Sequence, residues 1–161
     1  MRTPLSTITL DDQPAPVRLK IAAAWTSFMF LYVYVDVLGF YKPGHIDDIL
    51  DGQVFTFDIT QTWAVTVLAL LTVPITMVVA SATLPARRNR AVNLIVVALY
   101  VPFTAFNALG DTWTIFFSVG VVLELILLAL ITRWAWTWPR TTPTATRTSN
   151  SDRNTLHVRQ A

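Results

Sequence analysis

Four long apolar stretches constrain the fold of this 161-residue chain more than any other feature of its sequence. Each is about 20 residues long, the length that an α-helix needs to cross the roughly 30 Å hydrocarbon core of a bilayer. A backbone in that core has no water partners, so a spanning segment must satisfy its own N–H and C=O groups as a helix. We therefore predict an all-α, four-helix transmembrane bundle with spans at about 21–40, 62–84, 91–109 and 112–132.

The basic residues lie on one side of these stretches. Eleven of the twelve lysines and arginines precede the first stretch, separate the second from the third or follow the fourth, and Lys42 is the exception. The other two connections carry the acids Asp47, Asp48, Asp51, Asp58 and Asp111. An excess of Lys and Arg in cytoplasmic segments is the positive-inside pattern. It predicts a multi-pass protein of the inner (cytoplasmic) cell membrane, with both termini inside.

The segments outside the spans are polar or short. We predict a disordered cytoplasmic N-terminus at 1–17, a transmembrane domain at 18–138 and a disordered cytoplasmic tail at 139–161, because the two ends have little to bury. The first outer connection repeats apolar residues at helical spacing beside its acids. This pattern predicts a short amphipathic helix on the outer surface, which starts near Pro43–Gly44 and stops at Gly52.

Several classes of chemistry are excluded by the composition. The chain has no cysteine, which rules out disulfides, thiol redox chemistry and iron–sulfur clusters. His45 and His157 are its two histidines and both lie outside the spans, so we expect no haem or zinc site. Nucleotide loops, nucleophile elbows and zinc-protease motifs are missing as well. We expect a protein that is not an enzyme, with no catalytic residue, no cofactor and no metal.

Two acids, Glu124 and Asp36, lie inside the apolar stretches. An acid near the bilayer centre costs a few kcal/mol, so such residues usually face the bundle interior and find partners there. The second span offers a stripe of small or hydroxyl residues at helical spacing. The third span offers a polar stripe, Asn93, Tyr100, Thr104 and Asn107. We predict an intramembrane polar site made from Glu124, Tyr100, Asp36, Thr104, Asn107 and Thr66.

Depth along the helices divides this site into two layers. At 1.5 Å per residue, Glu124 and Tyr100 fall at a similar distance from the inner face, which predicts that they pair, with Thr72 or Thr76 nearby. An outer layer would contain the remaining residues, Asp36, Thr66, Thr104 and Asn107.

Three functions are compatible with this pattern, and the pattern favours the first. The first is a structural or interaction protein that uses its polar stripes for helix packing, with Glu124 protonated and acting as a neutral hydrogen-bond donor. The second is a small oligomeric proton-coupled transporter or channel with Glu124 as the protonation site, and the third is a membrane subunit of a redox complex. The expected partners are the lipid bilayer and a second copy or another membrane protein, and not nucleic acid. Arg87, Arg88 and Arg90 are expected to face lipid as basic anchors.

The sequence also resembles a known family. The stretch MFLYVYVDVLGFYKPG, the ITQ that opens the second span, the proline-centred VPITMVV and the RNRAVN of Arg88 to Asn93 carry the resemblance. They are similar to an uncharacterised bacterial family of small four-helix integral membrane proteins with a domain of unknown function. The similarity covers roughly 18–138, and its most specific element is Tyr34, Asp36 and Gly39. It implies the four-helix fold and no particular activity.

Overall fold

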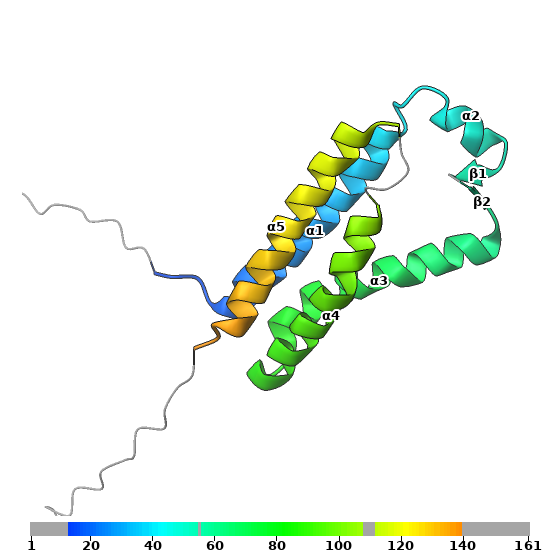
Figure 1. Cartoon of the computed structure of the whole chain (residues 1–161). Helices are drawn as coiled ribbons and strands as arrows, with labels where there is room; N and C mark the ends of the chain where they lie inside the picture. Colours follow the sequence, from blue (N-terminus) through cyan, green and yellow to red (C-terminus); the bar gives the residue numbers. More distant parts are fainter. Residues whose placement is uncertain (1–12, 55, 108–111, 140–161) are drawn as a thin grey trace, which may run out of the picture.

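Four long helices make up most of the structure, a computed structural model that describes residues 13–54, 56–107 and 112–139 (Figure 1). They are α1 (Val17–Gly39), α3 (Gln61–Thr83), α4 (Ala86–Phe106) and α5 (Thr114–Trp136). Each is long and apolar enough to cross a membrane. The predicted fold class is therefore confirmed, and the structure is that of a multi-pass membrane protein.

The helix boundaries differ from the expected ones where charged residues are present. Helix α1 already begins at Val17, within the segment that was expected to be a disordered N-terminus. Helix α4 begins at Ala86, so the three arginines expected in a loop lie on its first turns. Helix α5 continues past residue 132 to Trp136. The other terminal residues, 1–12 and 140–161, lie outside the described part of the chain, as do 108–111 at the expected end of the third span.

A small helix and a hairpin connect α1 to α3. Helix α2 (His45–Leu50) follows Gly44, whose φ of 83° is in the left-handed region that favours glycine. It confirms the predicted amphipathic helix. Strands β1 (Gln53–Val54) and β2 (Phe57–Asp58) then pair antiparallel, with Val54 opposite Phe57, and this hairpin was not predicted. We call this end of the bundle the hairpin end, and the opposite end, where α4 begins and α5 ends, the arginine end.

The core lies between the long helices. Helix α5 packs against α1 and α4, and α3 also packs against α1 and α4. Trp25 and Phe28 of α1 meet Tyr100 of α4 in edge-to-face contacts, with ring centroids 6.4 and 6.1 Å from that of Tyr100. Leu128 and Ile131 of α5 belong to the same buried cluster. Aromatic pairs in this geometry add to the packing of the buried area.

Helix α3 leans away from the other helices over its first half (Figure 1). Its buried residues, Pro74, Met77 and Ser81, all belong to the second half. Pro74 has no N–H, so the carbonyl of Leu70, one turn earlier, loses its helical donor. The hydroxyl of Tyr100 donates a hydrogen bond to that carbonyl. A side chain of α4 thus satisfies the backbone group that the proline leaves free.

Candidate functional site

Glu124 lies on the inner face of α5 and is only 3% exposed. Gly120, one turn earlier, allows α1 to approach α5 closely. A Cβ atom at position 120 would lie 2.9 Å from Cγ2 of Val35, closer than real Cβ contacts allow. The close approach of α1 and the packing of α4 on the other side exclude solvent and lipid from the Glu124 carboxyl.

The neighbour of Glu124 on α4 is Thr104, which is fully buried. The Thr104 hydroxyl approaches the Glu124 carboxyl as a hydrogen-bond donor would. Within the described residues, however, neither Oγ1 of Thr104 nor Oε2 of Glu124 makes a hydrogen bond of normal length and angle. Almost all buried polar atoms in proteins are hydrogen-bonded, so an unpaired pair of oxygens requires an explanation.

Further polar groups lie between this pair and the hairpin end. Asn107 of α4 donates a hydrogen bond from Nδ2 to the hydroxyl oxygen of Tyr32 of α1 at 3.3 Å. Asp36, one turn beyond Tyr32, is exposed, and its charge is close enough to interact with both Tyr32 and Glu124. His45 of α2 in turn interacts with Asp36. Side chains that can carry or share a proton therefore follow one another from α2 to Glu124.

Two predicted members of the site lie elsewhere. The Tyr100 hydroxyl is bonded to the Leu70 carbonyl, so the expected pairing with Glu124 is replaced by the approach of Thr104, one turn further along α4. Thr66 is exposed on the leaning half of α3 and bonds the carbonyl of Thr62 at 2.8 Å. The hydroxyls of Thr72 and Thr76 are likewise bonded to carbonyls of their own helix.

The pairing was wrong because depth counted from the expected ends of the spans does not fix the contacts between α4 and α5. The Arg90 guanidinium lies 5.3 Å above the ring centroid of Trp136, so the last turn of α5 is level with the first turns of α4. The sequence prediction ended this span one turn earlier, at residue 132. Helix α4 also begins five residues earlier than expected, so the two extensions largely offset each other, and the helix ends alone do not distinguish Tyr100 from Thr104 as the neighbour of Glu124.

A second buried polar cluster, nearer the arginine end, was only partly predicted. Asn93, expected as part of the α4 stripe, accepts a hydrogen bond from Nε1 of Trp25 at 2.7 Å. Its Nδ2 donates to Oδ1 of Asn89 at 2.6 Å, and Nδ2 of Asn89 donates to the carbonyl of Ser81 at 2.6 Å. All four residues are fully buried and join α1, α3 and α4. In the sequence, the cluster could have been recognised from the spacing of Asn89 and Asn93, which lie one turn apart on a helix that begins earlier than expected.

The arginines expected to face lipid lie at the start of α4. Arg87 and Arg88 are exposed, and Arg90 is half-buried against Trp136. Their contact with lipid stays a prediction.

The chemistry of the Glu124 pocket is that of one carboxyl and one hydroxyl in an apolar bundle. Among the described residues, no group of three or more His, Cys, Asp or Glu side chains could hold a metal ion. The carboxyl can exist with or without a proton, and the unpaired oxygens of Glu124 and Thr104 are the atoms that a proton or small cation would contact.

Comparison with known proteins identifies the family of this chain. No curated protein and no solved structure shows significant similarity to this sequence. Residues 17–145, which include all four long helices, match a family described as being of unknown function. The match covers well over half of the sequence, and the chain belongs to this family, DUF6326.

Proposed function

We propose that this protein is a small proton-coupled transporter or channel in which Glu124 binds and releases the proton. One observation carries the proposal: the carboxyl of Glu124 is buried beside the hydroxyl of Thr104, and within the described residues Oε2 of Glu124 and Oγ1 of Thr104 make no hydrogen bond of normal geometry. A buried acid that binds a mobile proton needs free acceptor positions of this kind.

A purely structural role explains the Asn93 cluster better than it explains Glu124. In the Asn93 cluster each side chain has a partner on a neighbouring helix or in its own helix, as packing interactions require. An acid in the membrane costs a few kcal/mol, and Oε2 of Glu124 recovers little of this without a hydrogen bond of normal geometry. Ionisable groups that persist in membrane helices at such a cost usually mark an ion or proton path.

The side chains between α2 and Glu124 support access from the hairpin end. Asp36 is exposed near His45, and Tyr32 and Asn107 are hydrogen-bonded at the level between Asp36 and Glu124. The opposite end carries Arg87, Arg88 and Arg90 and would face the cytoplasm of a cell membrane by the positive-inside rule. In this orientation the proton enters from outside.

The test is proton flux in liposomes that contain the purified protein. With a pH gradient in either direction and a pH-sensitive dye inside, the wild type should dissipate the gradient faster than protein-free liposomes. Glu124→Gln keeps the size and polarity of the side chain but cannot release a proton, so flux should fall to the protein-free rate while circular dichroism shows an intact fold. Asp48→Asn removes an exposed acid of α2 and should keep the wild-type rate.

Two results would contradict the proposal. One is a wild type that moves no protons under either gradient. The other is a Glu124→Gln variant as active as the wild type. A folded, inactive wild type would return the structural or interaction function to first place.

A further inference from the structure

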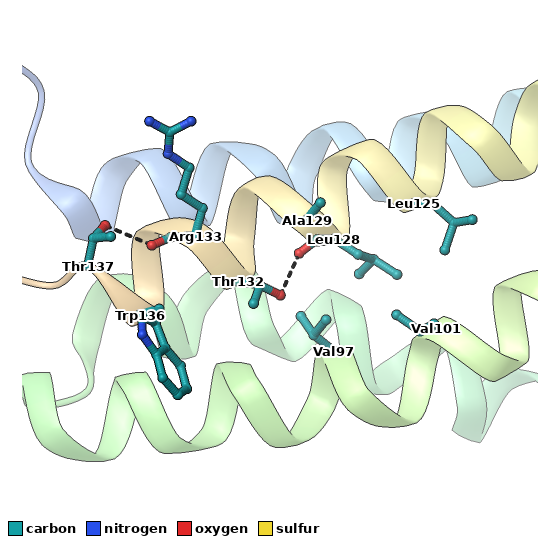
Figure 2. Close-up of a pocket in the computed structure, with 9 residues that line it drawn as sticks. All are labelled: Val97, Val101, Leu125, Leu128, Ala129, Thr132, Arg133, Trp136 and Thr137. Carbon is teal, nitrogen blue, oxygen red and sulfur yellow. Dashed lines mark hydrogen bonds between the residues drawn. The ribbon is translucent and has the colours of Figure 1, made fainter.

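A groove runs between α4 and α5 on the outside of the bundle (Figure 2). Val97 and Val101 of α4 face Leu125 and Leu128 of α5 across it, and its volume is about 420 Å³. Binding sites for small molecules typically have volumes of roughly 300–1,000 Å³. Because both helices are long and apolar enough to span a membrane, the groove opens toward the acyl chains of the bilayer.

The groove is apolar along its length and charged at one end. The hydroxyls of Thr132 and Thr137 on its wall donate to carbonyls of α5, at 2.9 and 2.7 Å, so they offer no free donor. At the arginine end Trp136 closes the groove, and the Arg90 guanidinium is held 5.3 Å above its ring centroid. Arg133 belongs to the groove lining, but its guanidinium points away from α4 (Figure 2). Arg90 is adjacent to the groove through its contact with the Trp136 ring.

The charge at this end favours an anion. The last turns of α3, the first turns of α4 and the last turns of α5 carry Arg87, Arg88, Arg90 and Arg133 and no acid. Arginine bonds phosphate oxygens through two parallel N–H donors, and basic residues at a membrane surface attract anionic lipid. A ligand that combines an acyl chain with a phosphate would complement both the groove and its charged end.

We propose that the α4–α5 groove binds an anionic phospholipid, with an acyl chain against Val101, Leu125 and Ala129 and the phosphate at Arg90. The other candidate occupant is α4 or α5 of a second copy of the chain. A second copy inserted in the same orientation would bring its own arginines to the same level. Like charges at close range repel, whereas a lipid phosphate neutralises them, so the lipid is the better match.

The experiment compares phosphatidylglycerol with phosphatidylcholine as added lipids. Delipidated protein in detergent is titrated with each, and retained lipid is counted by native mass spectrometry while thermal unfolding is followed in parallel. The wild type should retain phosphatidylglycerol in preference to phosphatidylcholine and unfold at a higher temperature with it. One basic residue near a membrane surface contributes about a fivefold change in binding, so Arg90→Gln should lower the preference about fivefold.

Paired variants distinguish lipid binding in the groove from general effects of charge and side-chain size. Val101→Trp fills the groove and should abolish phosphatidylglycerol retention, whereas Leu99→Trp adds the same bulk at a position of α4 that is 65% exposed and is not part of the groove lining. Arg87→Gln removes a neighbouring charge that does not contact Trp136 and should keep most of the preference.

Three outcomes would overturn the proposal. The first is equal retention of both lipids by the wild type. The second is unchanged retention in Val101→Trp. The third is a wild-type dimer that Val101→Trp converts to monomer without changing the lipid count, because the groove would then be occupied by a second copy.

Discussion

The hydrogen bond from Tyr100 to the Leu70 carbonyl leads to a prediction that needs two substitutions. In a regular helix that carbonyl accepts from the N–H of residue 74, and Pro74 has none. The Tyr100 hydroxyl takes the place of the missing donor. If this is why the hydroxyl matters, its importance should depend on the proline.

The size of the effect can be worked out from the groups involved. Tyr100→Phe removes one intramembrane hydrogen bond, which averages about 0.6 and reaches about 1.7 kcal/mol. It also leaves the Leu70 carbonyl without a partner, and a buried unpaired group costs about 1–3 kcal/mol. We therefore expect Tyr100→Phe to lower the free energy of unfolding by about 1–2 kcal/mol in the wild-type background. In Pro74→Ala, residue 74 donates its N–H to Leu70, and the same change should cost less than about 0.5 kcal/mol.

The assay is unfolding of the purified protein by SDS in mixed micelles, followed by circular dichroism. Four proteins complete the double-mutant cycle, and the interaction energy should be about 1 kcal/mol. Tyr34→Phe serves as a control, since Tyr34 is 60% exposed on α1. If Tyr100→Phe costs the same with and without Pro74, the hydroxyl does not replace the missing amide and the reasoning is refuted.

Two further predictions use the same unfolding assay. Asn93→Leu should lower the free energy of unfolding by about 2–4 kcal/mol, because it leaves several buried partners of its amide unpaired. Thr83→Val, which removes an exposed hydroxyl bonded within its own helix, should change it by less than about 0.5 kcal/mol, and equal losses would contradict the role of the Asn93 cluster. Gly120→Ala should cost about 1–3 kcal/mol through overlap with Val35. Val35→Ala should restore part of that loss, and no loss in Gly120→Ala would show that α1 and α5 can separate without cost.

The fold could be predicted from the sequence because membrane insertion imposes a simple rule on it. A helix that crosses a bilayer must be apolar over about 20 residues, and four stretches of this chain meet that condition. The ends of the helices are harder to predict, because charged side chains can extend to the membrane–water interface while their backbone stays helical. Arg87 and Arg88 look like loop residues in the sequence, yet α4 begins at Ala86.

The site could be predicted in its membership more than in its contacts. Glu124 and Asp36 were identified because acids are rare in membrane spans, and Thr104 and Asn107 because they share a helical face. Which of them approach Glu124 depends on how α4 and α5 are aligned along their axes, and a shift of one turn changes the partner of Glu124. The role of Trp25 depends on the rotation of α1 about its axis, which a hydrophobic sequence does not reveal, since an indole N–H hardly alters the apolar pattern.

The two polar clusters lie in different halves of the bundle, and the halves differ in how well buried hydrogen bonds join their helices. Toward the arginine end, the hydrogen bonds around Asn93 join α1, α3 and α4, and a satisfied buried network fixes helix positions. Toward the hairpin end, Oε2 of Glu124 and Oγ1 of Thr104 make no hydrogen bond of normal geometry within the described residues, and the first half of α3 leans away. The hydrogen bonds around Asn93 can therefore offset the free energy that burying Glu124 costs. Tyr100 lies between the halves, one turn from Thr104 and bonded to α3 at its proline. Any movement of the leaning half of α3 therefore acts on α4 next to the residue that faces Glu124.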